Sequence, residues 1–145
     1  MKLLLIIMAS IFIGYSNTKI EYVEVPVNDT IIIVDTFYVS HPTKESVYQE
    51  LINHEIPEAK IVLAQAIVET GNFTSKLTKT HHNIFGIRTR KGYKKYINYI
   101  ECIRDYKKLF SDKYRGGDYY RYLQRIGYAE APNYIEVLKG VVKTL

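Results

Sequence analysis

Apolar residues recur every three or four positions through most of the chain after residue 40, a spacing typical of helices that bury one face. A first helix is predicted to begin after Thr43, a candidate N-cap, and to run to about His54. A second helix is predicted from Pro57 to Gly71, where a glycine stands at a position that often ends a helix. This part of the chain is therefore expected to form two consecutive helices.

Three more helices are predicted over residues 98–112, 118–127 and 132–145. In the first of them Asn98 is a candidate N-cap, and Glu101 follows three residues later, the spacing of a capping box. These helices lack internal repeats, so they are expected to pack around one core.

The segment between the two groups of helices is polar and rich in turn residues. Residues 74–79 are expected to add a helical turn, residues 83–88 a tight turn, and residues 88–95 a hairpin. The predicted fold class is therefore mainly α (α+β): a helical domain over residues 41–145 with a small β-hairpin lobe.

The first 40 residues have a different pattern. Lys2 precedes an apolar run from Leu3 to Ile13 that contains one polar residue, Ser10, and Gly, Tyr and Ser follow at 14–16. We expect residues 1–16 to be a signal peptide, because a run this short does not comfortably cross a bilayer; an uncleaved N-terminal anchor in the membrane is the alternative. Residues 17–40 predict one or two short strands or an extended tether.

Length and charge limit what the chain can do. At 145 residues it can form one compact core, and we expect a monomer. Only two of the 20 basic and four of the 15 acidic residues precede His41, so the remainder carries 18 basic and 11 acidic residues, a formal charge of +7. Outside the cytoplasm such a domain attracts wall polymers with carboxylates or phosphates, or anionic membranes, and export argues against nucleic acid as a partner.

The segment "LAQAIVETG", Leu63 to Gly71, places Glu69 near the end of an otherwise apolar helix. Apolar neighbours and the negative end of the helix dipole both raise the pKa of a carboxyl there, which favours the protonated acid that glycosidic cleavage requires. Gln65, one turn earlier, could donate a hydrogen bond to Glu69 or to a sugar. The alternative is a solvated surface glutamate.

Four blocks of the sequence, "LAQAIVETG", "NIFGIR", "YIECIRDYKKLF" and "IGYAEAPNYIEVL", occur in an order that resembles the glucosaminidase family of peptidoglycan hydrolases, glycoside hydrolase family 73. The resemblance covers about His41 to the C-terminus. It implies a lysozyme-like α fold with a small β lobe beside the cleft, and cleavage of the β-1,4 bond after N-acetylglucosamine. It makes Glu69 the catalytic acid and Tyr128 a second catalytic candidate facing the scissile sugar. The residues implied to form the cleft floor are Asn83, Phe85 and Gly86.

The chain departs from this family in one respect. Members often carry a second acid in the β lobe, whereas residues 87–99 contain no Asp or Glu. Glu101 is the nearest downstream carboxylate, but its spacing from Asn98 favours a capping role, and Asp105 is expected to be structural. Two routes avoid the missing carboxylate: attack by the 2-acetamido group of the sugar, or attack by a water that Tyr128 holds. Loss of activity with retained glycan binding is a third alternative.

The predicted hairpin combines cations with aromatic rings. Tyr93 and Tyr96 are candidate sugar-binding residues, and the strip could bind a polyanion or be a solvated hairpin. The cations of this strip are Arg88, Arg90, Lys91, Lys94 and Lys95.

Metal and thiol chemistry are disfavoured. His81 and His82 are adjacent and lack the spacing of a metal pair, so neither a metal nor a cofactor is expected. The single cysteine, Cys102, excludes an intramolecular disulfide and lies inside a predicted helix, where packing explains it better than a thiol hydrolase does.

Together these features predict an exported hydrolase, secreted or periplasmic, that acts on peptidoglycan glycan strands at the cell envelope. The alternatives are a muramidase or lytic transglycosylase, which cuts on the other side of the sugar repeat, and an inactive wall-binding module.

Overall fold

The computed structural model describes residues 26–27, 30–31 and 41–145. The chain divides into two compact units, Met1–Ser40 and His41–Leu145. In the first unit β1 (Pro26–Val27) pairs antiparallel with β2 (Thr30–Ile31), so two of the short strands expected over residues 17–40 are present. The predicted signal peptide, residues 1–16, lies outside the described residues. Among the residues that are described, no helix is long and apolar enough to cross a membrane.

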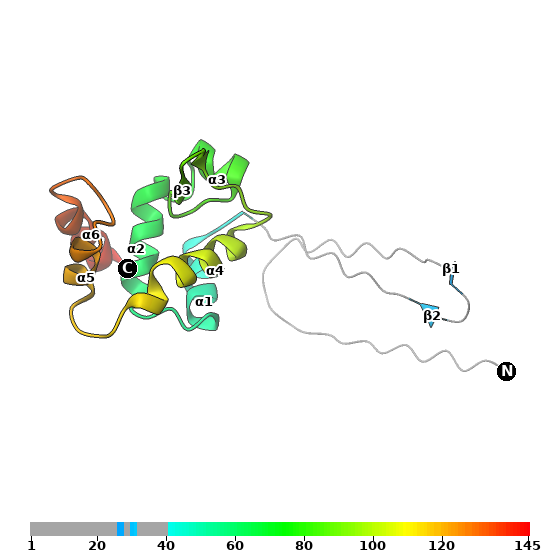
Figure 1. The fold of residues 1–145 in the computed structure, drawn as a ribbon, viewed down its shortest axis with the longest axis horizontal. Helices are drawn as coiled ribbons and strands as arrows, with labels where there is room; N and C mark the ends of the chain where they lie inside the picture. The colour runs from blue at the N-terminus through cyan, green and yellow to red at the C-terminus, as the bar shows by residue number, and fades with distance from the viewer. Residues whose placement is uncertain (1–25, 28–29, 32–40) are drawn as a thin grey trace. The chain divides into compact units, whose positions relative to one another are not determined.

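The second unit is a bundle of helices with one hairpin, so the predicted mainly α fold is confirmed (Figure 1). Its helices are α1 (Lys44–Asn53), α2 (Ala59–Thr70), α3 (Lys76–His81), α4 (Tyr99–Leu109), the 3₁₀ turn η1 (Ser111–Lys113), α5 (Tyr119–Arg125) and α6 (Tyr134–Thr144). The hairpin consists of β3 (Arg88–Thr89) and β4 (Gly92–Tyr93), with Arg88 opposite Tyr93.

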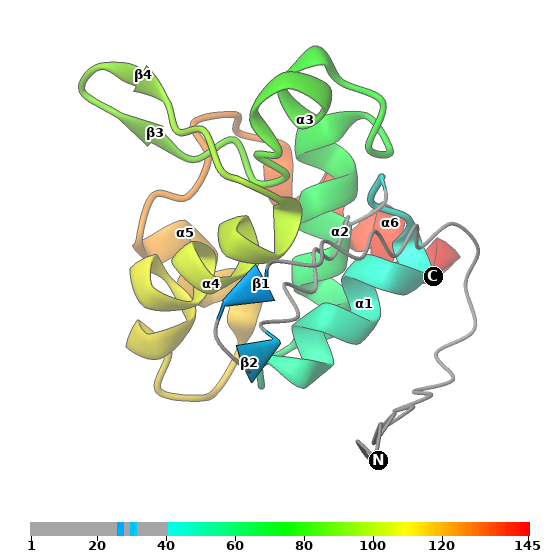
Figure 2. The same cartoon turned by 90° about the vertical axis from the view of Figure 1, so that its right-hand side faces the viewer.

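Helix α2 is the centre of this unit. Most of its residues are buried, and it packs against α1 on one side and α6 on another, as a helix that is apolar all round must. Figure 2 shows α2 between these neighbours, with α3 and the β3–β4 hairpin at its C-terminal end. The end of α2 that carries Glu69 is therefore surrounded by several elements that are distant in sequence.

Polar caps start three of the helices where the sequence predicts them. Thr43 accepts a hydrogen bond from the Ser46 amide (3.1 Å) before α1, and Asn98 accepts one from the Glu101 amide (2.9 Å) before α4. Asp118 accepts from two amides at the start of α5. These local bonds satisfy amides that have no partner inside the helix, so the chain direction changes at these positions.

Several helix boundaries differ from the prediction by two or three residues, among them the start of α2, at Ala59 instead of Pro57. Helix α4 ends at Leu109 instead of near Asp112, because Phe110 leaves the helical conformation (φ −125°, ψ −58°) and a 3₁₀ turn follows. The last helix begins at Tyr134 instead of Pro132. Helix ends depend on a few backbone angles, which apolar periodicity does not specify.

Candidate active site

Glu69 lies half-buried one residue before the end of α2. The chain then turns sharply: Gly71, Asn72 and Phe73 all have positive φ angles (56°, 60° and 66°). The Thr70 hydroxyl accepts a hydrogen bond from the Phe73 amide (2.8 Å) and fixes this turn. Glu69 therefore projects from a rigid helix end.

The environment of Glu69 raises the pKa of its carboxyl. Burial is the main cause, and a hydrogen bond donated by the Tyr134 hydroxyl to Glu69 Oε1 (3.2 Å) opposes it in part. This raised pKa agrees with the prediction made from the apolar residues of the helix. A carboxyl of this kind keeps its proton at a higher pH than an exposed glutamate does.

Gly86 brings the backbone of the next segment against the same carboxyl. Its φ is +64°, and a Cβ atom built at this position would lie 3.1 Å from Glu69 Oε2. Any other residue would be strained in this left-handed backbone conformation, and its Cβ would come into close contact with Glu69. Glycine is therefore required where the turn passes Glu69.

We expect Gly86→Ala to reduce stability by about 1 to 2 kcal/mol, because alanine is strained at this φ. It should also reduce turnover, since the new methyl group pushes the Glu69 carboxylate aside. Gly116→Ala is the matched control, because Gly116 also has positive φ (+91°) but no atom within 4 Å of an added Cβ. Thermal melts and turnover of both variants test this: equal activity loss in the two would contradict a specific role for Gly86.

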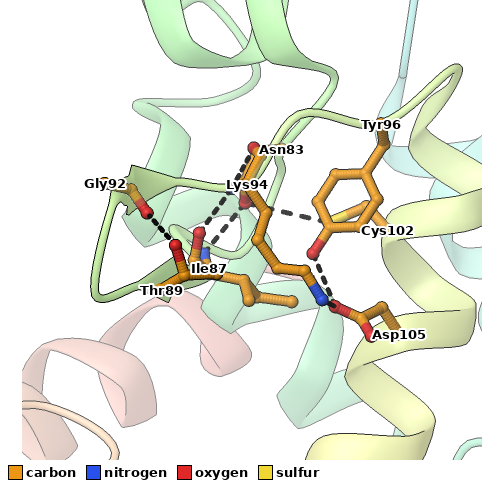
Figure 3. A network of polar contacts seen from close by, with 8 residues as sticks. All are labelled: Asn83, Ile87, Thr89, Gly92, Lys94, Tyr96, Cys102 and Asp105. Carbon is orange, nitrogen blue, oxygen red and sulfur yellow. Dashed lines mark hydrogen bonds and ion pairs between the residues drawn. The ribbon is translucent and has the colours of Figure 1, made fainter.

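Asn83 holds the turn that contains Gly86 (Figure 3). Its side-chain amide donates to the carbonyls of Ile87 (2.8 Å) and Lys94 (3.0 Å), and its Oδ1 accepts from the Ile87 amide (2.9 Å). Asn83 is fully buried, so its side chain does not reach a surface where a sugar could bind. The family resemblance implies that Asn83 forms the cleft floor, and the structure shows that its buried side chain supports the turn beside Glu69 from the interior.

Tyr128 lies close to this turn, as its predicted role requires. Its hydroxyl donates to the Phe85 carbonyl (3.3 Å), and its ring lies 5.9 Å from that of Tyr134. Phe85 is 3% exposed and packs on Tyr106 with ring centroids 4.2 Å apart. Phe85 therefore forms part of the packed base under the turn, and Tyr128 is held at its edge.

Tyr134 is the functional candidate that the sequence analysis missed. It is 8% exposed, it opens α6, and it is the residue whose hydroxyl reaches Glu69. The sequence feature that could have indicated Tyr134 is its position in the segment "IGYAEAPNYIEVL", which also contains Tyr128. The packing of α6 on α2 creates the contact, and that packing is not visible in the sequence.

Gln65 also requires a correction. It lies one turn before Glu69 but is fully buried, so it does not contact a sugar. Its Oε1 accepts a hydrogen bond from the Tyr106 hydroxyl (2.7 Å). Tyr106 has one hydroxyl proton, so Tyr119, 3.1 Å away, must donate to Tyr106. Gln65 therefore anchors a buried chain of hydroxyl groups behind the site.

A comparison with known families agrees with this geometry. Residues 44–145 match the model of the glucosaminidase family, described as mannosyl-glycoprotein endo-beta-N-acetylglucosaminidase. The chain belongs to the glucosaminidase family. A glucosaminidase domain implies a glycoside hydrolase that acts on peptidoglycan, and hence action at the cell envelope. No curated protein matches the chain at a significant level.

Glu101 has a local role in this glucosaminidase domain. Its amide is capped by Asn98, which is one half of the predicted capping box. Its carboxylate forms an ion pair with Arg104 on the same helix and is 42% exposed. These contacts do not link Glu101 to Glu69.

Asp105 joins α4 to the β lobe of the glucosaminidase domain. It accepts hydrogen bonds from Lys94 Nζ (2.6 Å) and from the Tyr96 hydroxyl (2.7 Å), so its predicted structural role is confirmed (Figure 3). The Tyr96 hydroxyl is thus engaged within the protein, and the sugar contact expected of its ring stays a prediction. Tyr93 remains 48% exposed.

Thiol chemistry finds no support at Cys102. The side chain is fully buried, and burial raises the pKa of its thiol to about 12, far from the thiolate form that a nucleophile needs. Within the part of the chain that the structure describes, no group of three or more His, Cys, Asp or Glu side chains could hold a metal ion.

Proposed function

We propose that this chain cleaves the β-1,4 bond after N-acetylglucosamine in peptidoglycan, with Glu69 as the general acid. The observation that supports this most is the half-buried Glu69 carboxyl with a raised pKa, between the Tyr134 hydroxyl and the Gly86 turn. Export through residues 1–16 is part of the proposal, because the substrate lies outside the cytoplasm.

The two oxygens of Glu69 have different surroundings. Oε1 accepts the hydrogen bond from Tyr134, which leaves Oε2, on the side of Gly86, as the oxygen that carries the proton. In the reaction this proton passes to the glycosidic oxygen as its bond to the anomeric carbon breaks. The sugar that leaves then departs as an alcohol and not as an unstable alkoxide.

Departure of the sugar also requires a nucleophile at the anomeric carbon, which residues 87–99 do not supply as a carboxylate. In our proposal the 2-acetamido oxygen of N-acetylglucosamine attacks the anomeric carbon and forms a cyclic intermediate. Water then opens this intermediate and transfers its proton to the Glu69 carboxylate, which restores the acid. In this route Tyr128, which is held beside the Gly86 turn, orients the acetamido group.

Product analysis tests the bond that is cut and the route. Digested peptidoglycan should yield fragments that end in reducing N-acetylglucosamine, and proton NMR of a fresh digest should show retention of anomeric configuration. Fragments ending in reducing N-acetylmuramic acid or an anhydro sugar would indicate a muramidase or lytic transglycosylase instead. Inversion would indicate direct attack by water, and binding without sugar release would indicate a wall-binding module.

The Tyr134 hydrogen bond gives a pH prediction. Because this bond lowers the Glu69 pKa, Tyr134→Phe should raise that pKa further, and protonated Glu69 should persist to higher pH. The alkaline limb of kcat/KM should therefore move to higher pH, while turnover falls about tenfold from the loss of orientation. Tyr48→Phe, at an exposed tyrosine on α1, is the control. An unchanged alkaline limb in Tyr134→Phe would contradict the assignment of that limb to Glu69.

A further inference from the structure

The β3–β4 hairpin follows directly after the turn that flanks Glu69. Gly86 lies so close to Glu69 that an added Cβ would be 3.1 Å from Glu69 Oε2, and β3 begins only two residues later, at Arg88. At about 3.3 Å per extended residue, Arg88 lies about 7 Å along the chain from Gly86, and the hairpin tip about 13 to 17 Å. A glycan strand that binds at Glu69 therefore passes within reach of this hairpin.

The hairpin carries positive charge without a compensating acid. Residues 87–99 contain five cations and no Asp or Glu. Lys94 is neutralised by Asp105 at 2.6 Å. The other four, Arg88, Arg90, Lys91 and Lys95, are exposed, and no ion pair joins them to a carboxylate of the described residues. We call these four residues the basic lobe.

The base of the basic lobe is held in place before any ligand arrives. Asn83 bonds both sides of the hairpin base, and the Lys94 amide donates to the Ile87 carbonyl (2.9 Å). The Arg88 guanidinium lies 4.4 Å from the centre of the Tyr93 ring, its cross-strand partner. Cross-strand partners share one face of a hairpin, so Arg88 and Tyr93 present a stacked cation on an exposed face. A cation held in this way loses less conformational entropy when it binds an anion.

We propose that the basic lobe binds the carboxylates of the peptide side chains on the glycan strand that is being cut. This inference rests on the proposed function, because it uses the same substrate at the same catalytic residue. An ordinary solvated hairpin would mix both signs of charge, whereas the four exposed cations here match several anions in a row. The guanidinium group of arginine can donate two parallel hydrogen bonds to one carboxylate. Wall polymers that carry phosphate share this anionic chemistry, and the test below distinguishes them.

The test removes the charge of the basic lobe and measures binding to the wall. The variant is R88Q/R90Q/K91Q/K95Q in the full chain, on a Glu69→Gln background so that the wall is not digested. The matched control is K44Q/K60Q/K108Q/K113Q, which removes four exposed lysines outside the hairpin. Sedimentation with purified wall should show about tenfold weaker binding for the basic-lobe variant and little change for the control. Added salt should weaken binding by the unmodified lobe more than by the variant.

Two modified walls and one lipid vesicle identify the anion. Amidation of wall carboxylates should weaken binding of the unmodified lobe to the level of the variant, whereas removal of wall phosphate with hydrofluoric acid should leave it unchanged. Loss of binding only after phosphate removal would overturn the peptide-carboxylate assignment, and so would equal losses in variant and control. Binding to anionic phosphatidylglycerol vesicles that depends on the lobe, without such dependence on wall, would overturn it in favour of a membrane.

Turnover separates this inference from the proposed function. With Glu69 restored, the basic-lobe variant should lose kcat/KM on peptidoglycan, mainly through KM, but keep its rate on neutral N-acetylglucosamine oligomers. An unmodified chain that binds the wall through the lobe yet releases no sugar would refute the proposed function alone. A chain that releases reducing N-acetylglucosamine equally well with and without the lobe's charges would refute this inference alone.

Discussion

Glu69→Gln should reduce turnover on peptidoglycan by about 100-fold to 10,000-fold, the range expected when a general acid is removed. Glutamine has nearly the same shape and can still accept the hydrogen bond from Tyr134, so the fold and wall binding should persist. Stability should not fall at neutral pH, because burial raises the Glu69 pKa and the ionised carboxylate therefore carries a desolvation cost that the amide avoids. This advantage of the variant should grow as the pH rises through the raised pKa. Assays of released reducing ends and thermal melts across pH measure both effects.

Glu101→Gln is the matched control for Glu69→Gln. Its carboxylate pairs with Arg104 at an exposed position, where an ion pair contributes at most about 1 kcal/mol. This variant should fold and retain most activity. Full activity in Glu69→Gln would remove the proposed mechanism, and loss of activity in a stable Glu101→Gln protein would make Glu101 the second catalytic group.

Asn83→Ala should destabilise the domain by about 3 kcal/mol. The change removes four hydrogen bonds, one of them the weak bond donated by the Cys102 thiol (3.8 Å), and leaves the Ile87 amide and two carbonyls without their buried partner. The turn that carries Gly86 should then move relative to Glu69, so turnover of the folded fraction should also fall. Urea unfolding gives the free energy, and activity at a temperature where the variant is fully folded gives the second effect.

Asn53→Ala is the control for Asn83→Ala. Asn53 is exposed on α1 and accepts one hydrogen bond, from Gln49 (3.0 Å). Its loss should cost about 0.5 kcal/mol or less and leave turnover unchanged. A similar small loss at Asn83 would mean that the turn is held by its surroundings and not by this side chain.

The sequence predicted most of the elements because their signals are local. Periodic apolar residues gave the helices, and Thr43, Asn98 and Asp118 marked their starts, since an N-cap acts on amides only two or three residues away. The hairpin over residues 88–95 also depends on neighbouring residues. Glu69 could be selected for the same reason, because its position in an otherwise apolar helix can be read from neighbouring residues.

The roles of polar residues around Glu69 were harder to predict. Gln65 and Asn83 have the composition of sugar ligands, yet both are fully buried and bond to other parts of the protein. Tyr96 likewise uses its hydroxyl on Asp105. A sequence shows that a side chain can form hydrogen bonds, but only burial decides whether its partner is a ligand or the protein itself.

By itself, the sequence determined the helical domain, the position of its hairpin, the general-acid candidate Glu69 and the positive charge of the lobe, because each depends on residue type and short-range spacing. Only the tertiary structure decided that the Tyr134 hydroxyl bonds to Glu69, 65 residues away, and that Gly86 lies beside the other carboxyl oxygen of Glu69. Those contacts result from the packing of α6 and the Asn83 turn against the end of α2. Packing between distant segments depends on how whole surfaces fit together, and the order of residues along one segment does not contain that information.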